Sequence, residues 1–495
     1  MGRAQSLYSV PVPTIRNRDN FPAYERPLEE RYLQTLLTNT VGNTFYADQQ
    51  TLMQESDQVH NDMLDVDPEF AAKALAFARN EGFMRLQPIL GLAKLSAVKQ
   101  TLFARAFPHV IKIPSDLSDF LTILNGQGRG EGGRAVKREV GGFLNGVSEY
   151  WALKYNGRGR GYSIGDMVAT AHVKAANDRQ NRLFRYAMGK ETPLGGLPQL
   201  AAFEALKRAE TDDERIRWIN EGKLPHEIVT GAIKPTKAVW NAILEQMPIF
   251  ALLRNLNTMD RAGVLDERQA YISARLTDGE ALRKSKILPF RFLSAYNEVQ
   301  KPWLKDALRQ AVELTFDNLP NIDGRTAVFL DISGSMDGQY LRIGSVFALA
   351  LYKKTGGDSL FWLFNTQVGD AQPSRVDSIL SQAERIRSFG GTDTGAPVRA
   401  LLGHPQPFDN IIIITDEQQN VGSPFYRELL TYRQARNQSA RAYVIDLAPY
   451  QSGMVPPSDK LTHYLYGWSD AILSYIAQSQ RGYGDMVQAV RGMEL

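Results

Sequence analysis

The sequence predicts a multidomain protein in which a long all-helical region is followed by an α/β domain with a doubly wound parallel sheet. Residues 28–320 contain repeated apolar patterns of period 3.6 in segments of helical length, and almost no alternation of period two. From Thr326 onward, short continuous apolar runs alternate with helical stretches. This alternation is typical of parallel strands that are covered on both faces. The turn-rich stretch Asn318–Arg325 separates the two patterns.

We therefore expect an amino-terminal arm over residues 1–24, a helical region over 25–320 and an α/β domain over 321–495. Ala238–Leu256 repeats the helical period clearly, with Pro248 as a kink or a helix boundary. Many short helices in series without a strand signal suggest stacked helix pairs of the solenoid kind. No fixed repeat length accompanies the pattern.

The composition excludes several kinds of site. Of the 495 residues, 22% are charged and 43% are hydrophobic, as in ordinary globular proteins. The absence of cysteine excludes disulfides, thiolate zinc sites, iron–sulfur ligation and a cysteine nucleophile. The histidines are scattered without a His-x-x-x-His pair, which argues against a histidine-rich metal site. No segment reaches the roughly 18–20 apolar residues that cross a bilayer, and no secretory signal is visible. We therefore expect a cytoplasmic protein without a membrane partner.

The basic residues are unevenly distributed along the chain. Residues 1–320 carry a net charge of +5 (42 basic against 37 acidic residues), and residues 321–495 carry −2 (15 against 17). Residues 151–190 hold eight basic and only two acidic residues, and there we expect a polyanion to dock. The eight are Lys154, Arg158, Arg160, Lys174, Arg179, Arg182, Arg185 and Lys190.

Two stretches rich in glycine and arginine, Asn125–Arg134 and Asn156–Gly161, interrupt the helical pattern. Such loops let backbone and guanidinium groups approach phosphates closely, and a plain surface loop is the alternative interpretation. The first stretch contains Gly128-x-Gly130-x-x-Gly133, which formally matches a dinucleotide fingerprint. It lacks the preceding strand that such a site requires.

Three loops of the α/β domain carry oxygen ligands at the carboxyl ends of predicted strands, where the ligand sites of such sheets lie. Asp331–Met336 follows the first strand, Thr415–Glu417 follows the apolar run of residues 411–414, and Gly390–Thr394 lies between them. Carboxylate and hydroxyl oxygens without nitrogen or sulfur suit Mg²⁺. A serine nucleophile is the alternative, but neither a Gly-x-Ser-x-Gly elbow nor a base motif accompanies it.

The order of these loops resembles the metal-ion-dependent adhesion site of von Willebrand factor A domains, over roughly residues 325–490. The loops carry Asp-x-Ser-x-Ser, then Gly-Gly-Thr, then a strand that ends in Thr-Asp. The resemblance implies a divalent metal, most simply Mg²⁺, with some ligands acting through water and with an acidic group of a partner able to complete the shell. An A domain whose site stays empty is the alternative. The implied ligand positions are Asp331, Ser333, Ser335, Thr392 and Asp416.

The helical region resembles the TROVE module of the Ro autoantigen family. The segments that carry this resemblance are Thr44–Tyr46, Phe143–Tyr155, Gly161–Lys174, Trp240–Leu256 and Ile287–Phe290. Together with the A domain, the resemblance spans roughly residues 25–490 and points to a Ro protein of the bacterial type. It implies HEAT-like helical repeats that the A domain closes into a ring.

The resemblance also implies a function. In that family the ring binds small noncoding Y RNAs on a basic outer surface, and single-stranded 3′ ends of misfolded or structured RNAs enter a central hole. Bacterial relatives are adaptors that join a Y RNA to the exoribonuclease polynucleotide phosphorylase. We therefore expect a noncatalytic RNA-binding protein of RNA quality control or processing. A protein-binding scaffold that grips a partner carboxylate through the metal is the alternative. A metal-dependent nuclease is disfavoured because no second carboxylate cluster accompanies the single-metal ligands.

The family's RNA-contact pattern is matched in part by Lys154-Tyr155, Gly161-Tyr162-Ser163 and His172-x-Lys174. The loop before Gly161 is longer here, so either Arg158 or Arg160 supplies the pattern's arginine. The cations would neutralise phosphates, while tyrosine and histidine rings would contact bases. A core histidine and a solvated helix face are the alternatives for His172 and for the three later arginines. The expected RNA-binding residues are Lys154, Arg158, Arg160, Tyr162, His172, Lys174, Arg179, Arg182 and Arg185.

Overall fold

The chain forms two compact units. The computed structural model describes residues 11–38, 42–130, 132–157, 161–285, 287, 290–316, 321–469, 475–477, 479–480 and 485–495. The first unit comprises Met1–Gln87, Leu288–Asn297 and Arg309–Glu494. The second comprises Pro88–Ile287, Glu298–Leu308 and Leu495.

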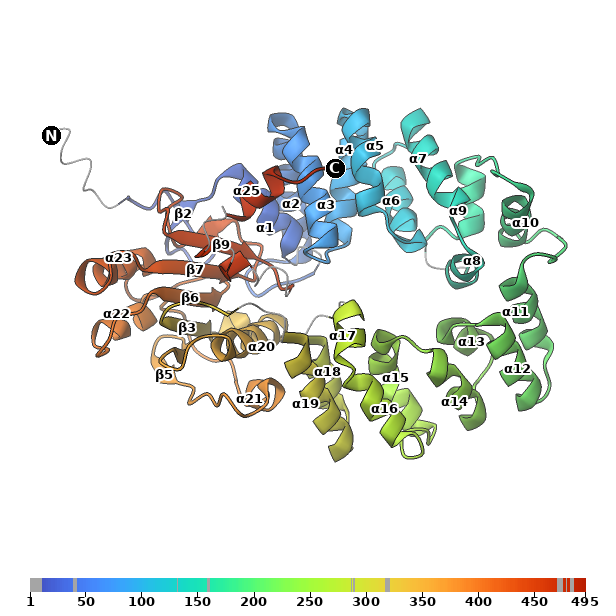
Figure 1. The fold of residues 1–495 in the computed structure, drawn as a ribbon. Coiled ribbons are helices and arrows are strands. Elements are labelled where there is room, and N and C mark those ends of the chain that lie inside the picture. The colour runs from blue at the N-terminus through green and yellow to red at the C-terminus, as the bar shows by residue number, and fades with distance from the viewer. Residues whose placement is uncertain are drawn as a thin grey trace. The chain divides into compact units, whose positions relative to one another are not determined.

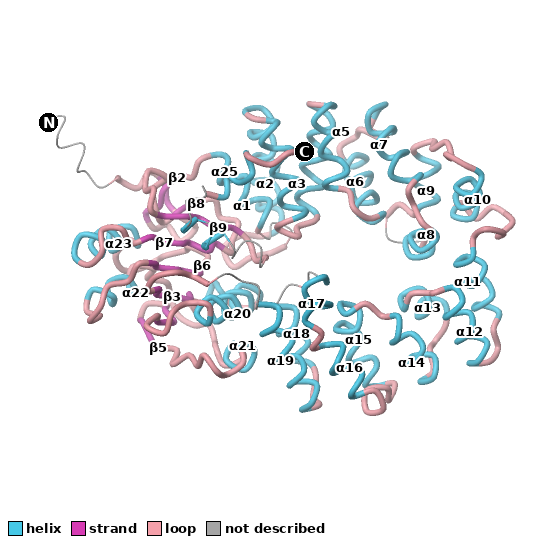
Figure 2. The backbone as a smooth tube through the Cα atoms, in the orientation of Figure 1, coloured by secondary structure: helices cyan, strands magenta, loops and turns pink. Residues whose placement is uncertain are grey.

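The regular structure between residues 28 and 316 is helical throughout the described part, as the sequence predicts (Figures 1 and 2). Pro248 is a helix boundary, because it directly precedes α15 and follows the end of α14 at Gln246. The helices are α1 (Leu28–Leu37), α2 (Gln49–Val66), α3 (Pro68–Asn80), α4 (Leu86–Val98), α5 (Gln100–Val110), α6 (Pro114–Gly126), α7 (Gly133–Asn145), α8 (Glu149–Tyr155), α9 (Ile164–Thr170), α10 (Asp178–Ala187), α11 (Pro198–Arg208), α12 (Asp212–Gly222), α13 (His226–Ala232), α14 (Lys237–Gln246), α15 (Ile249–Arg261), α16 (Gln269–Leu276), α17 (Gly279–Ser285), α18 (Phe290–Glu298) and α19 (Pro302–Phe316).

Helices of the second unit pack mainly against helices that are close in the chain. Contacts join α5 to α7, α9 to α10, α11 to α12 and α12 to α14. Aromatic rings fill one such interface, where Phe103 and Phe107 of α5 each lie 5.9 Å from Phe120 of α6, centroid to centroid. Packing between sequence neighbours is how a stacked helical array builds its core.

The carboxyl-terminal part of the first unit is a six-stranded sheet with the order β5-β4-β3-β6-β7-β9. All neighbouring pairs are parallel except β4 with β5. Its strands are β3 (Thr326–Asp331), β4 (Leu360–Phe364), β5 (Val368–Asp370), β6 (Asn410–Thr415), β7 (Arg441–Asp446) and β9 (Thr462–Tyr466). The connecting elements are η1 (Gly334–Met336), α20 (Gln339–Lys353), α21 (Ile379–Ala383), α22 (Ala396–Leu402) and α23 (Phe425–Ala435), and α25 (Met486–Arg491) follows.

Helices cover both faces of this sheet, which confirms the predicted doubly wound fold. Alternate strand residues such as Phe329 and Ile413 share a buried cluster with Leu401 of α22 and Leu429 of α23. The opposite face meets α20, where a Cβ on Gly344 would lie only 2.8 Å from the Leu330 side chain. Because both faces are buried, the strands read as continuous apolar runs.

Residues of the predicted amino-terminal arm form strands. β1 (Ile15–Arg16) pairs with β2 (Pro22–Glu25), and β2 pairs with β8 (Ser452–Gly453) of the α/β domain. Both pairs are antiparallel. These strands make a separate three-stranded sheet. The strand Pro22–Glu25 is therefore packed on the carboxyl-terminal domain, and Ile15–Arg16 pairs with it.

Arg26, directly after β2, is a buried cation at this junction. The residue is 3% exposed, and its guanidinium forms ion pairs with Glu417 and with Asp446, the latter at 3.4 Å. It also donates to the Tyr466 hydroxyl at 2.6 Å and lies 3.8 Å from the centre of the Tyr464 ring. One side chain thus joins the amino-terminal strand to three strand ends of the large sheet.

Both ends of the helical series belong to the same compact unit as the α/β domain. At the first end, Arg491 of α25 pairs with Glu29 of α1 at 2.8 Å. At the last end, Glu313 of α19 pairs with Lys353 of α20 at 2.9 Å and accepts a hydrogen bond from the Ile379 N–H at 2.7 Å. The α/β domain therefore contacts the first and the last helices of the series. Among the described residues, no helix is long and apolar enough to span a bilayer.

Candidate functional site

The predicted oxygen ligands lie at the carboxyl edge of the large sheet. β3 and β6 run parallel with Leu330 opposite Ile414, so the next residues, Asp331 and Thr415, reach the same edge. The Thr415 hydroxyl donates a hydrogen bond to Asp331 Oδ2 at 2.6 Å. The strand register therefore brings the first and third predicted loops together.

The loop after β3 folds back on its own carboxylate. Asp331 Oδ1 accepts a hydrogen bond from the Ser333 N–H at 2.8 Å, and the Ser333 and Ser335 hydroxyls lie 3.3 Å apart. The turn η1 follows, and its Gly334 N–H donates to the Gly390 carbonyl at 2.9 Å. This last bond attaches the second predicted loop to the first.

The remaining two predicted ligands complete a buried set. Thr392 donates its N–H to Asn420 Oδ1 at 2.9 Å, and Asp416 follows β6 directly. All five predicted positions are at most 5% exposed. The structure therefore places two carboxylates and three hydroxyl-bearing residues in adjoining loops, as the sequence predicts.

The electrostatics of the two carboxylates fit a cation. Burial raises the pKa of Asp331 to about 6. Burial, together with the charge of Asp331, raises the pKa of Asp416 to about 7. Asp416 Oδ2 is buried without a hydrogen-bond partner among the described residues. A divalent ion would supply the missing positive charge, and the hydroxyl-rich donor set suits Mg²⁺.

A substitution at Asp416 tests this fit. We expect Mg²⁺ at one hundred times its Kd to stabilise the wild-type protein by about 2.7 kcal/mol, and Asp416→Asn to abolish this gain. Without metal, Asp416→Asn should be at least as stable as the wild type, because one of two adjacent buried charges is gone. Thermal unfolding with and without Mg²⁺ measures both effects. Equal stabilisation of the two proteins by Mg²⁺ would contradict the assignment.

The predicted RNA contacts that the structure describes are spread over α8, the connections before and after α9, and α10 in the second unit. Lys154 of α8 is not a solitary cation, because it pairs with Glu227 of α13 at 2.6 Å and donates to the Tyr150 hydroxyl at 2.8 Å. These contacts raise the pKa of Lys154 against the effect of burial, which lowers it. Arg158 and Arg160 lie outside the described residues.

The arginines of α10 differ in their surroundings. Arg179 pairs with the buried Glu149 at 2.7 Å, Arg182 lies 3.8 Å from Asp178, and Arg185 donates to the Glu191 carbonyl at 2.8 Å. Arg185 is exposed, whereas Arg182 is half-buried. Arg185 is therefore the member of the three whose charge is most available to an RNA.

Glu149 gives Arg179 a structural role. One carboxylate oxygen accepts from Arg179, and the other accepts from the N–H groups of Gln199 (2.9 Å) and Leu200 (3.1 Å) at the start of α11. Glu149→Ala should lower the free energy of unfolding by about 2–3 kcal/mol, because charged hydrogen bonds are lost in a buried site. Urea denaturation measures this change. A loss below about 0.5 kcal/mol would contradict the role.

The connections before and after α9 carry the other candidates. His172 and Lys174 are exposed, so His172 is not a core residue, and its backbone is left-handed with φ +51°. Tyr162 is half-buried and donates its N–H to Ser118 Oγ at 2.9 Å. Gly161 must be glycine here, because φ is +76° and a Cβ would lie 2.7 Å from the same oxygen.

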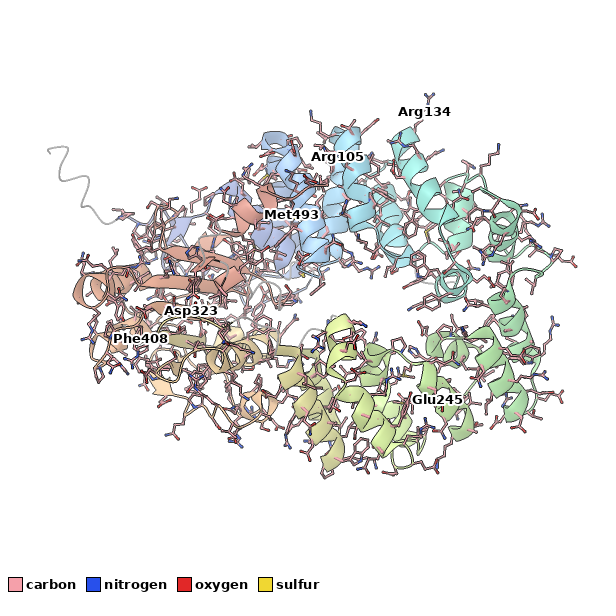
Figure 3. The ribbon with its side chains drawn as sticks, in the orientation of Figure 1. Arg105, Arg134, Glu245, Asp323, Phe408 and Met493 are labelled. Atoms are coloured by element: carbon pink, nitrogen blue, oxygen red, sulfur yellow. The ribbon has the colours of Figure 1, made fainter. Side chains whose placement is uncertain are left out.

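Other cations of this unit are also exposed. Lys174 and Lys190 have no carboxylate partner among the residues that the structure describes. Arg134, the second residue of α7 and the last of the first glycine-rich stretch, extends away from its helix in Figure 3. Sequence analysis did not select Arg134 or Lys190 as binding residues, although both belong to the basic stretches that it identified.

Two residues that hold the backbone of the second predicted metal loop, Asn420 and Asn365, were not among the predicted site residues. Asn420 fixes the Thr392 backbone, and the Asn365 carbonyl accepts the Asp393 N–H at 2.9 Å. Neither residue carries a local signal, because each acts on a loop that is distant in the chain.

The helical series, the doubly wound domain and its oxygen-lined loops define a class of protein in which helical repeats are joined to an A-type domain. A family model described as "TROVE domain" matches residues 228–334. RNA-binding protein RO60 of Deinococcus radiodurans is 25% identical over 512 aligned residues, covering 94% of this chain and 95% of the relative. RNA-binding protein RO60 of Caenorhabditis elegans is 27% identical over 57% of this chain and 48% of the relative.

The fold has a solved counterpart. The crystal structure of Deinococcus radiodurans Ro (RSR) protein matches with a TM-score of 0.68 and 23% identity, over 91% of this chain and 100% of that one. The chain is thus similar to TROVE-domain and Ro proteins, in agreement with the resemblance of its motifs, and it shares the fold of the bacterial Ro structure.

Proposed function

We propose that the chain is an RNA-binding protein. The observation that carries the proposal is the similarity to a protein named for RNA binding over 94% of the chain. A second support is the exposed cationic stretch around α9 and α10, in which Lys174, Arg185 and Lys190 are available to phosphates. We call these three residues the α10 cations.

The proposed mechanism is electrostatic capture of a folded RNA. The α10 cations neutralise phosphates, and each contact releases counterions, so binding weakens as salt rises. The exposed His172 ring adds a surface on which a base stacks or forms hydrogen bonds. Lys154 and Arg179 mainly hold helices together through Glu227 and Glu149.

The proposal extends to the kind of RNA and its fate. We assign a small noncoding Y RNA to the basic surface and the single-stranded 3′ end of a structured or misfolded RNA to a central opening. The closed ring of repeats and its central opening are what the resemblance to the Ro family implies, and they form part of this proposal. An exoribonuclease such as polynucleotide phosphorylase is the proposed partner that receives the RNA end.

A binding assay with two RNAs tests this proposal. One RNA is a stem-loop with a single-stranded 3′ tail, and the other is the same stem-loop with a blunt end. We expect both to bind with salt-dependent affinity and the tailed RNA to bind more tightly. Absent or salt-insensitive binding would contradict RNA recognition. Equal affinity for both would contradict the role of the 3′ end.

The A domain contributes a metal site to this proposal. A divalent cation, most simply Mg²⁺, supplies the positive charge that the buried Asp331 and Asp416 lack. Ser333, Ser335 and Thr392 would provide the neutral oxygens. Residues beside the site, Gln418 and Gln419, hold Arg18 and Asn17 of the amino-terminal segment, and the proposal assigns them no catalytic role.

A protein-binding scaffold is the second candidate. It is favoured by Asp416 Oδ2, which is buried without a hydrogen-bond partner among the described residues. This free oxygen indicates that the ligand shell of the proposed metal is incomplete. In this candidate a partner's carboxylate completes the shell. Asp331→Ala separates the two functions, because it should abolish capture of such a partner while RNA affinity stays unchanged. A parallel loss of RNA binding would favour one joint function.

A further inference from the structure

The amino-terminal segment of the chain lies against the metal loops of the A domain. Asn17 donates a side-chain hydrogen bond to the Gln419 carbonyl at 2.8 Å, and the Arg18 N–H donates to Gln418 Oε1 at 2.8 Å. Both acceptors follow the predicted ligand Asp416 within three residues. All of these residues belong to the first compact unit. A carboxylate, Asp19, comes next in the chain at this position.

Asp19 is tied to the second metal loop by one side chain. Asn420 donates its Nδ2 to Asp19 Oδ2 at 2.7 Å, and its Oδ1 accepts the Thr392 N–H at 2.9 Å. A single amide thus bridges the acidic group and the backbone of a predicted ligand. This bridge uses both ends of the asparagine amide and fixes its orientation.

Tyr46 connects Asp19 to the first metal loop. Its hydroxyl donates to Asp19 Oδ2 at 3.2 Å, and the Ser335 side chain is near enough to act on the same hydroxyl. Its ring packs edge-on against Tyr450, with centroids 5.8 Å apart. The hydroxyl thus lies between Asp19 and the first predicted metal loop.

We propose that Asp19 is the acidic group that completes the metal site from within the chain, held in place by Asn420 and Tyr46. The inference rests on the proposed metal site. Asp416 Oδ2 is buried without a partner among the described residues, so the site has an unused oxygen for a cation. Asp19 then places its negative charge beside the site and acts on the ion through Tyr46 or water, because the described residues hold no group of three Asp, Glu or His side chains that could bind one ion together. Groups that orient ligands in this way raise metal affinity.

The proposal couples metal binding to docking of the amino-terminal segment. If Asp19 favours the metal, the metal must favour the docked position of Asp19 by the same free energy. The segment carries β1 and β2 and leads directly into Arg26 and α1. Metal occupancy would thereby strengthen the attachment of the first helix of the series to the A domain.

Calorimetry with Mg²⁺ tests the inference on the full-length chain. We expect Asp19→Asn and Tyr46→Phe each to raise the Kd for Mg²⁺ about tenfold. Asp65→Asn is the matched control, since it removes an exposed carboxylate from α2 in the same unit. In Asp19→Ala, added acetate should restore part of the lost affinity, whereas it should not change that of the wild type.

Hydrogen exchange supplies a second measurement that needs no substitution. Mg²⁺ should slow amide exchange in residues 15–25 and 42–46 of the wild type, and should not do so in Asp331→Ala. Mg²⁺ affinities of Asp19→Asn and Tyr46→Phe equal to the control would overturn the inference while leaving the metal site intact. A wild-type chain that binds no Mg²⁺ would overturn both the inference about Asp19 and the proposed metal site. The RNA-binding assays would still test the proposed function of the second unit, because they do not depend on the metal.

Discussion

Reversing the charge of the α10 cations is expected to lower RNA affinity on the order of 10²-fold at about 0.15 M salt. The triple variant is Lys174→Glu, Arg185→Glu and Lys190→Glu. Each lost phosphate contact removes the entropy gained by releasing a counterion, so the slope of log K against log salt should also become shallower by about 2–3. Filter binding of the tailed stem-loop RNA at several salt concentrations measures both quantities.

A second triple variant controls for overall charge. Lys207, Lys237 and Lys284 are partly or fully exposed lysines of the same unit, and each already pairs with a carboxylate. Replacing these three with glutamate changes the net charge equally but should weaken binding far less. If both triple variants lose affinity to the same extent, binding depends only on net charge and the α10 cations have no special role.

Arg26→Met is expected to have the largest effect on stability, a loss of about 3–5 kcal/mol in the free energy of unfolding. The substitution leaves Glu417 and Asp446 buried without their cation. Burial, followed by the charge of Glu417, raises the pKa of Asp446 even beside Arg26, so this region accommodates unpaired negative charge poorly once the cation is removed. Guanidinium denaturation measures the loss.

A double variant identifies the cause of this loss. Adding Glu417→Gln to Arg26→Met should recover part of the stability, because the second change removes one of the orphaned charges. Arg16→Met, at an exposed position of β1, should change stability little. Full stability of Arg26→Met would show that the amino-terminal strand does not depend on this ion-pair cluster.

The helices and the strands of the large sheet could be predicted from the sequence because each of these two kinds of element carries a local signal. The strands β3 and β6 are continuous apolar runs, and burial on both faces requires such runs. The antiparallel strands β2 and β8 carry no comparable signal. They are short and pair residues that are more than 400 positions apart, such as Tyr24 and Gly453. Their pairing depends on tertiary contacts, so the amino-terminal segment was expected to be an arm.

The candidate sites divide in the same way. The meeting of the proposed metal loops could be predicted because these loops follow strands whose parallel register brings Asp331 and Thr415 to one edge. The surroundings of the basic residues could not. Lys154 of α8 forms an ion pair with Glu227 of α13, so its charge is neutralised by a contact between two helices. A basic residue in a sequence has no visible counter-charge when its partner is 73 positions away in the chain.

The RNA that copurifies with the chain tests the central claim most directly. The protein would be isolated from cells at low salt, and the bound nucleic acid would be sized and sequenced, for the wild type and for the triple variant of the α10 cations. The account predicts a small structured RNA enriched with the wild type, released by high salt and depleted in the variant. Recovery of no RNA, or of the same RNA in equal amount from both proteins, would contradict it.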